Sequence, residues 1–200
     1  MSLTKLNIKL KVLQELEHIR FPKCNTRKNV SSESNESFVL GEVNYRGQHF
    51  CQGKTRGESR YNTRYETLYN LLRSLIRLYK PEFTYTTIQI NKNVKCLPHI
   101  DMNNVGESYI IGLGDYTGGQ LNIEGKLYNI RNRWKRFNGH KVHWTEPWEG
   151  NRYSLIYFTH TFKPPNRKLT NLVITRKGIY DKNSNFIEDI DTSIRGVAPR

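Results

Sequence analysis

The sequence predicts an α+β fold in one domain, with helices in the N-terminal third and antiparallel β-structure in the rest. Leucine and isoleucine recur at helical spacing over residues 3–19 and again over residues 63–80. After Pro81 the chain consists of short β-prone segments separated by Gly, Asn and Pro, as far as about residue 176. Strands at such regular intervals, without helices between them, indicate a sandwich or barrel rather than alternating β-α units.

The two helices are predicted from apolar stripes and from signals at their ends. Ser2 is a candidate N-cap for the first helix. In the second, Thr63 and Glu66 have the spacing of a capping box, in which the two side chains satisfy free amides of the first turn. Pro81 ends this helix because proline cannot continue it. We therefore expect two amphipathic helices beside the β-structure.

The other segments predict loops, strands and a tail. Residues 25–37 are polar and predict a loop, and residues 38–45 predict a strand. Gly118 and Gly119 are expected to form a tight hairpin between two later strands, because glycine reaches dihedrals closed to other residues. The later strand candidates are FTYTTIQIN, SYIIGLG, GQLNIEG, KLYNI, KVHW, RYSLIYF and NLVITR. The expected single domain spans residues 1–200, with a helical part at 1–82, the β-core at 83–176 and a polar tail at 177–200.

The composition is strongly basic. Lys and Arg number 32 against 18 Asp and Glu, which gives a formal net charge of +14 and a pI near 9.8. Such an excess favours a polyanionic partner such as nucleic acid, although basic faces also serve solubility. The cations concentrate in two stretches, one with Lys54, Arg56, Arg60 and Arg64 and the other with Arg131, Arg133, Lys135, Arg136 and Lys141.

Composition also excludes several classes of protein. No run of about 18 apolar residues is present, so neither a membrane span nor a membrane partner is expected. The charged first twenty residues are unlike a signal peptide, which predicts an intracellular location, cytoplasmic or nuclear. Three cysteines without a CxxC spacing predict neither a disulfide framework nor a thiolate zinc site. The oligomeric state is left open by these features.

Histidine and aspartate residues provide a candidate metal site. His99 and Asp101 flank one residue, so on an extended chain both side chains project to one face and can reach a single ion. About forty residues later, His140 and His143 offer a third ligand. Two histidines and one carboxylate on one face of an octahedral ion form the facial triad of non-haem Fe(II) oxygenases. The HxD pair alone occurs often by chance, so the prediction depends on its combination with the downstream residues.

Arg152 and Ser154 are two residues apart on a predicted strand and therefore point to the same side. If that side is the barrel interior, the two residues form a clamp for a carboxylate, because a buried guanidinium needs an anionic partner. The alternative is an ordinary surface arginine on a half-exposed strand.

The order of these motifs resembles the double-stranded β-helix core of the Fe(II)/2-oxoglutarate-dependent dioxygenases. Over about Phe83 to Phe158 the chain has HxD, a Gly-Gly turn, a histidine and Arg-x-Ser in the family's order. The segments PHIDMNNVGESYIIGLGDYTGGQL and FNGHKVHWTEPWEGNRYSLIYF are similar to a viral and algal type of subgroup with HxDxxNxGxS, GDYxGG and FDGxxxHxxxPFxGxRYSLxYF. Asn138 and Trp148 depart from the aspartate and phenylalanine of that pattern, and neither is a ligand position. The resemblance implies a jelly-roll core with the N-terminal helices packed on it.

The resemblance also assigns the metal ligands. It implies that His99, Asp101 and His143 bind Fe(II) and belong to the catalytic set together with Arg152. The choice of His143 follows from spacing, since it lies nine residues before Arg152, close to the family's usual interval. His140 lies twelve residues before Arg152, which is long for the family.

The implied co-substrates are 2-oxoglutarate and O₂, with ascorbate as a candidate reductant. Arg152, assisted by Ser154, would hold the distal carboxylate of 2-oxoglutarate, and Asn91 is a further candidate for a hydrogen bond to it. The implied reaction converts 2-oxoglutarate to succinate and CO₂ and hydroxylates a second substrate. The class of enzyme expected is therefore an oxidoreductase, a 2-oxoglutarate-dependent oxygenase.

Residues near the motifs are candidates for contact with that second substrate. Asn104 and Ser108 follow the HxD pair, where they would orient it, touch the substrate or serve only the loop. Arg133 and Trp134 combine a cation with a ring that can stack on a base. The alternative is that Trp134 packs in the core beside Phe137.

Three functions remain open from the sequence. The first is a hydroxylase acting on a nucleic-acid base, with a loose similarity to the ten-eleven-translocation and base-J thymine hydroxylases, whose target base is extruded from the helix. The second is a protein or peptidyl hydroxylase of the prolyl type, with a peptide as partner. The third is a non-catalytic cupin-like module that binds metal or nucleic acid.

Overall fold

The computed structural model describes residues 3–24, 30, 35–44 and 56–161, together with three strands between residues 173 and 188. The chain forms two compact units, Met1–Lys163 and Pro164–Arg200. The second unit holds an antiparallel sheet of three strands, in the order β13 (Val173–Thr175), β14 (Gly178–Tyr180) and β15 (Phe186–Glu188). The first unit contains all the predicted site residues.

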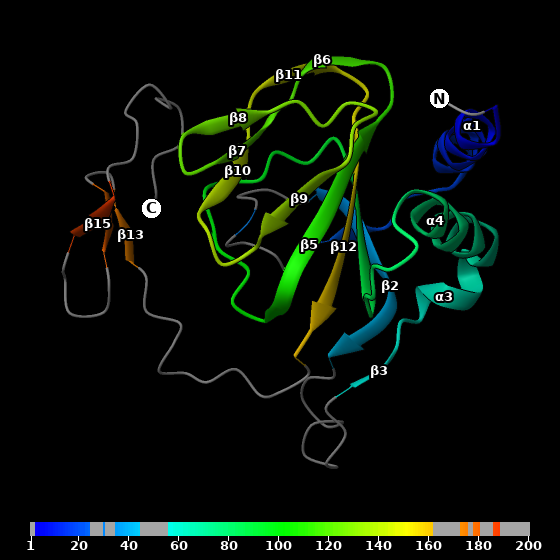
Figure 1. Ribbon diagram of the computed structural model, residues 1–200, viewed down its shortest axis with the longest axis horizontal. Helices are drawn as coiled ribbons and strands as arrows, with labels where there is room; N and C mark the ends of the chain where they lie inside the picture. Colours follow the sequence, from blue (N-terminus) through cyan, green and yellow to red (C-terminus); the bar gives the residue numbers. More distant parts are fainter. Residues whose placement is uncertain are drawn as a thin grey trace. The chain divides into compact units, whose positions relative to one another are not determined.

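The first unit is built on one large antiparallel sheet (Figure 1). Its strand order is β1-β2-β4-β12-β5-β9, and β3 pairs with β2 off this path. Strand β12 lies in the middle, paired on one side with β4 and on the other with β5. The strands are β1 (Lys23–Cys24), β2 (Asn35–Asn44), β3 (Arg56–Glu58), β4 (Thr87–Lys92), β5 (Asn104–Leu113), β9 (Lys135–Asn138) and β12 (Tyr153–His160).

Two smaller sheets lie over one face of the large sheet (Figure 1). One has the order β10-β7-β8, with β7 (Leu121–Ile123), β8 (Lys126–Tyr128) and β10 (His143–Thr145). The other pairs β11 (Trp148–Gly150) with β6 (Tyr116–Gly118). All the strand pairs are antiparallel, and the two layers form a jelly-roll core.

Helices α1 (Leu3–His18), α3 (Tyr61–Arg64) and α4 (Glu66–Tyr79) lie on the other side of the large sheet (Figure 1). The helical periodicity of the sequence places leucines on one face of α4, and Leu68, Leu72 and Leu75 are fully buried there. Their burial against sheet residues such as Ile88 and Leu155 stabilises the domain by about 1.5–3 kcal/mol per side chain. The helices therefore cover the apolar face of the sheet.

Strand periodicity gives the opposite face of the sheet a different character. In β12, Leu155 and Tyr157 point toward the helices. Because side chains alternate along a strand, Ser154 points the other way, as does Arg152 just before the strand. In β4, Ile88 and Ile90 face the helices, and the polar residues Gln89 and Asn91 alternate with them. A buried polar surface thus lines the interior between the two layers of the jelly roll.

The predicted α+β class and jelly-roll core with N-terminal helices are confirmed, and two local predictions are wrong. Thr63 does not cap α4, because a separate turn, α3, precedes it and the N-cap is Tyr65, which makes no side-chain capping bond. The chain bends at Tyr65 (φ −122°, ψ 44°), whose buried ring and hydroxyl, donating to the Arg20 carbonyl at 2.6 Å, fix that conformation.

Gly118 and Gly119 do not form a hairpin. The strands on either side of them belong to different sheets, since β6 pairs with β11 and β7 pairs with β8 and β10. Both glycines have positive φ, 73° and 63°. A Cβ at Gly119 would lie 2.9 Å from Cδ and Nε of Arg152, so glycine is needed here for close approach to that side chain.

The strands differ from the predicted segments in their bounds and number. The segment FTYTTIQIN forms a strand only from Thr87. The sequence does not predict the short strands β1, β3, β6, β9, β11, β14 and β15, of which β14 and β15 lie in the segment expected to be a tail. In the described part of the chain, no helix is long and apolar enough to cross a membrane. Lys54 and Cys51 lie outside the described residues.

Candidate metal centre and co-substrate pocket

Two backbone pairings bring His99, Asp101 and His143 together. The amide of His99 donates to the carbonyl of His143 at 3.1 Å, and the amide of His143 donates to the carbonyl of His99 at 3.0 Å. The amide of Asp101 donates to the carbonyl of Gly139 at 2.8 Å. Residues more than forty positions apart are therefore held opposite each other as an antiparallel bridge.

The three side chains converge on one point. His99 Nε2 lies 3.8 Å from Asp101 Oδ1, and His143 Nε2 lies 3.7 Å from Asp101 Oδ2. One ligand atom from each residue lies within 4.8 Å of the others. The nitrogen-to-oxygen separations are too long for hydrogen bonds, so the side chains face a shared space. Both histidines are buried and Asp101 is half-buried.

The backbone fixes which nitrogen of each histidine is available. Nδ1 of His99 lies 2.6 Å from the carbonyl of Leu97, and Nδ1 of His143 lies 2.8 Å from the carbonyl of Lys141. A carbonyl only accepts, so each Nδ1 carries the proton and each Nε2 presents its lone pair to the shared space. This hydrogen-bond pattern prepares both imidazoles as metal ligands.

The donor set fits a non-haem iron site. Two imidazole nitrogens and one carboxylate on one side of an ion leave the remaining positions open for small molecules, which is the arrangement of the Fe(II) oxygenases. His140 is not part of the group. It is exposed, and its Nε2 lies 2.9 Å from the carbonyl of Asn104.

Arg152 is the largest of the fully buried side chains, with 1% of its surface exposed. It immediately precedes β12, and its Nε donates to the carbonyl of Gly119 at 3.3 Å. The guanidinium carbon lies 5.6 Å from the ring centre of Tyr116 and 5.5 Å from that of Trp148. Desolvation lowers the pKa of Arg152, and Tyr116 acts in the opposite direction.

No carboxylate of the described residues pairs with Arg152. A buried positive charge without an anionic partner is unfavourable unless a ligand supplies the negative charge. The chemistry around Arg152, which lies between Tyr116 and Trp148, therefore fits a small molecule with a carboxylate.

Comparison with solved structures supports the same fold. No protein-family model matches the sequence, and no curated protein does. An oxidoreductase of the 2OG-Fe(II) oxygenase family from Burkholderia pseudomallei superposes with a TM-score of 0.51 at 17% identity, over 74% of this chain and 76% of that chain. The chain has the fold of the 2OG-Fe(II) oxygenases. A structure of NgTET1 in complex with 5mC DNA superposes with a TM-score of 0.45 at 14% identity, over 80% of this chain and 68% of that chain.

In this oxygenase fold, Asn91 and Ser154 lie opposite each other on neighbouring strands β4 and β12. Asn91 Nδ2 donates to Ser154 Oγ at 3.1 Å, and Gln89 Nε2 donates to Asn91 Oδ1 at 3.0 Å. The three buried side chains form a polar row on the interior face that carries Arg152. The structure thus brings the predicted co-substrate residues onto one surface.

Asn104 and Ser108 lie against the triad. Asn104 Nδ2 is 3.4 Å from both Asp101 Oδ2 and Ser108 Oγ. Both side chains are buried, and a Cβ at Gly139 would lie 3.0 Å from Asn104 Nδ2. The sequence left three roles open for Asn104 and Ser108: to orient the HxD pair, to touch the substrate or to serve only the loop. The contact between Asn104 and the Asp101 carboxylate favours the first role.

The structure does not bring Trp134 to the triad. Its ring packs on the helix side of the sheet, with ring centres 6.0 Å from Tyr79 and 5.6 Å from Tyr157. Phe137 lies on the opposite face of β9, where its ring contacts that of His143 at 5.1 Å. Arg133 is exposed in the turn before β9. Trp134 is therefore a core residue, although not beside Phe137.

Sequence reasoning missed Tyr116 as a site residue. Its hydroxyl is buried and has no hydrogen-bond partner among the described residues, and a Cβ on Gly112 would collide with it. Burial raises the pKa of Tyr116, so the hydroxyl keeps its proton and can donate to a ligand beside Arg152. The only sequence signal is its position inside the GDYTGG motif.

Proposed function

We propose that the protein is an Fe(II)- and 2-oxoglutarate-dependent oxygenase that hydroxylates a nucleic-acid base. The oxygenase proposal is supported by one combination: a His-Asp-His group and a buried arginine without a carboxylate partner, both inside the jelly roll. Fe(II) and 2-oxoglutarate, when bound, supply the oxidising chemistry with O₂ and release succinate and CO₂. The residues of the chain position the reactants for this chemistry.

Each residue has a distinct task in this proposal. His99, Asp101 and His143 hold the metal through Nε2, a carboxylate oxygen and Nε2. Asn104 orients the carboxylate of Asp101 through its amide, 3.4 Å away. Phe137 packs against the ring of His143 and keeps water from that side.

The co-substrate is held at the other end of the pocket. The guanidinium of Arg152 binds the distal carboxylate through charge-assisted hydrogen bonds, which are strong because the site is buried. Ser154, two residues along the same strand face, and Tyr116, whose ring centre lies 5.6 Å from the guanidinium carbon, would supply hydroxyl donors to the same carboxylate. The orientation of 2-oxoglutarate would then be fixed before O₂ arrives.

The nucleic-acid part of the proposal is supported by charge. The net charge of +14 favours a polyanion, and exposed cations follow the segment around β9. Three of these cations are paired: Arg131 with Asp115 at 3.1 Å, Arg136 with Glu107 at 3.4 Å and Lys141 with Glu124 at 2.6 Å. The remaining positive charge in this stretch comes from Arg133 and Lys135.

The oxygenase proposal is tested by anaerobic addition of Fe(II) and 2-oxoglutarate to the protein. The expected result is the weak visible charge-transfer band of the ternary complex, lost in His99→Ala and kept in His18→Ala, a histidine on the exposed face of α1. A wild-type protein without the band, but with bound metal, would instead be a cupin-like metal-binding module.

The substrate is tested by succinate release with single-stranded DNA, duplex DNA, RNA and a proline-rich peptide. Base hydroxylation predicts release stimulated by nucleic acid, together with binding that weakens steeply as salt rises, because phosphate contacts displace counterions. Stimulation by the peptide alone would contradict the nucleic-acid proposal and favour a peptidyl hydroxylase.

A further inference from the structure

A second cavity lies away from the proposed active site. It has a volume of about 770 Å³ and lies between the outer face of α4, the β2–β3 pair and residues 81–86. The metal ligands and Arg152 are not among the residues that line it. Because α4 packs on the apolar face of the large sheet, this cavity and the triad lie on opposite sides of that sheet. The proposed oxygenase reaction gives the cavity no role.

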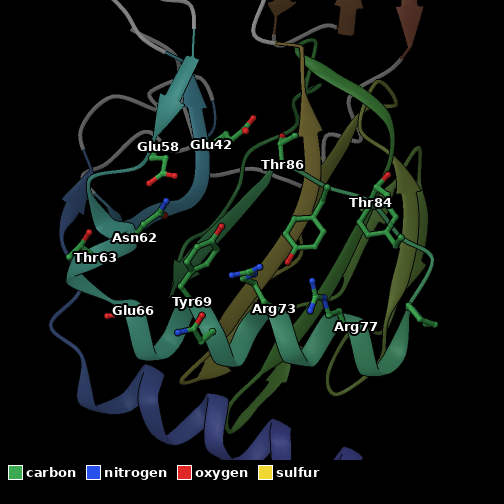
Figure 2. A pocket seen from close by; sticks show the side chains of 14 residues that line it. Glu42, Glu58, Asn62, Thr63, Glu66, Tyr69, Arg73, Arg77, Thr84 and Thr86 are labelled. Atoms are coloured by element: carbon green, nitrogen blue, oxygen red, sulfur yellow. The ribbon is translucent and has the colours of Figure 1, made fainter.

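Two arginines form one wall of the cavity. Arg73 and Arg77 are four residues apart on α4, so their side chains leave the same face of the helix. Figure 2 shows both guanidiniums directed from α4 into the cavity, with the Tyr69 hydroxyl on the same face. Arg73 also lies over the Tyr69 ring, 5.5 Å from its centre.

These two arginines have no carboxylate partner in the part of the chain that the structure describes. Like charges at this spacing on a helix repel each other. The cations near β9 differ, because Arg131, Arg136 and Lys141 each have a carboxylate beside them. An anion bound between Arg73 and Arg77 would relieve this repulsion.

Tyr85 supplies a hydrogen-bond donor at the same wall. Burial, with a smaller contribution from Tyr69, raises the pKa of Tyr85 to about 12, and Arg73 and Arg77 act in the opposite direction. The hydroxyl therefore keeps its proton at neutral pH. Tyr85, Arg73 and Arg77 all line the same cavity.

The opposite wall of the cavity is acidic. Glu42 and Glu58 are direct cross-strand neighbours in the β2–β3 pair, and both line the cavity. Figure 2 shows Glu42 and Glu58 across the cavity from the two arginines. Carboxylates in the same cavity as the cations repel an extended polyanion such as DNA, whereas a compact anion can bind at the arginine wall alone.

We propose that this cavity binds a small molecule through a phosphate monoester group held by Arg73 and Arg77. Two guanidiniums present two forked sets of donors, which match the three oxygens of a phosphate and its charge of about −1.5 to −2. A carboxylate has only two oxygens and one charge, so a single arginine satisfies it. This site needs neither iron nor 2-oxoglutarate, so it stands or fails independently of the oxygenase proposal.

The test titrates glycerol 3-phosphate into the full chain at constant ionic strength and follows backbone amide shifts by NMR. Saturable shifts at residues 69–77 and 84–86 are expected. Affinity should fall at least tenfold in the Arg73→Gln/Arg77→Gln variant. It should be unchanged in Arg60→Gln/Arg64→Gln, a matched pair four residues apart that also lies over tyrosine rings but outside the cavity.

Three results would overturn the proposal: no saturable shift, equal binding by the Arg73→Gln/Arg77→Gln variant, or tighter binding of a short single-stranded DNA at the same amides. Circular dichroism checks that the variant is folded. If that variant does not fold, Thr84→Glu gives the same answer, because it adds a negative charge to the exposed rim and leaves both arginines in place. It should also weaken binding at least tenfold, and unchanged binding would again contradict the site.

Discussion

At the scale of single residues, the interior of the jelly roll holds a positive charge that no carboxylate of the described chain neutralises. Arg152 is almost completely buried between two aromatic rings. Its Nε is satisfied by a carbonyl, and the outer nitrogens remain for a ligand. A protein tolerates such a group where binding an anion offsets its desolvation.

Arg152→Gln should therefore abolish tight binding of 2-oxoglutarate and leave metal binding intact. Removal of one partner from a buried charged pair costs about 2–5 kcal/mol, which corresponds to roughly 30-fold to several thousand-fold in affinity. Isothermal titration with 2-oxoglutarate under anaerobic conditions measures the change. Arg133→Gln removes an exposed arginine and should bind as the parent does; similar losses in both variants would contradict the role of Arg152.

Tyr116→Phe should lower the affinity for 2-oxoglutarate by about two- to tenfold, because one hydrogen bond contributes about 0.5–1.5 kcal/mol. The hydroxyl has no partner among the described residues, so its removal should not lower the melting temperature. A destabilised variant with unchanged affinity would show that the hydroxyl serves the fold instead.

Asn104→Ala should reduce metal affinity by about 10- to 100-fold, the usual effect of losing a residue that orients a metal ligand. Competition with a chelator measures the affinity. Asn103→Ala is the control, since the Asn103 carbonyl, which accepts from the amide of Thr161, belongs to the backbone and is kept in the variant. Equal affinity in the two variants would exclude Asn104 from this role.

At the scale of elements, the link between β6 and β7 shapes the surroundings of Arg152, the proposed co-substrate residue. Gly119 has a left-handed backbone, and its missing side chain leaves room for Arg152. The carbonyl of the same residue accepts from the Arg152 Nε. One residue thus both makes space for the guanidinium and fixes its position.

Gly119→Ala should lower the affinity for 2-oxoglutarate by more than tenfold, because the new methyl group would lie 2.9 Å from Arg152 and displace its side chain. Gly125→Ala is a matched control. It also has a positive φ, of 81°, but a Cβ there meets nothing within 4 Å. Both variants should lose about 1–2 kcal/mol of stability from left-handed strain, and only the first should lose co-substrate affinity. Thermal unfolding and titration separate the two effects.

Elements also show how far the sequence could predict the site. His99 and Asp101 could be paired from strand parity, which is a local property, and their spacing to His143 and Arg152 follows a family pattern. Tyr116 could not be identified as a site residue from the sequence, because its contact with Arg152 depends on the pairing of β6 with β11. The Gly118–Gly119 link was mistaken for a hairpin for the same reason: partner choice in a sheet is a long-range property.

At the scale of the whole molecule, the helix layer and the β-core were predictable from the change of hydrophobic period after Pro81. The cavity on α4 was not, since it depends on how the β2–β3 pair and residues 81–86 are placed around the helix. The helix layer is held by the leucines of α4 and by Tyr157, whose hydroxyl donates to the Leu72 carbonyl at 3.0 Å. Stability of the whole domain therefore depends in part on a buried phenol.

Stability should fall at alkaline pH. Burial raises the pKa of Tyr157 well above its ordinary value of 10 and that of Tyr85 to about 12. In the unfolded chain both phenols ionise near pH 10, while in the folded protein they keep their protons. Their contribution is thus present below pH 10 and is lost as the pH rises above it. Melting temperatures between pH 8 and 11 should decline, and the decline should be smaller in Tyr157→Phe; an identical decline in the two proteins would contradict this origin.

The central place of β12 in the large sheet bears on how the molecule is made. A nascent chain that ends before residue 153 carries all three proposed metal ligands, yet β4 and β5 lack the strand that pairs with both of them. The two parts of the sheet, β1-β2-β4 and β5-β9, must therefore wait for this late strand before they can join. On the ribosome, we expect the site to be assembled only after the last strand of the jelly roll has left the exit tunnel.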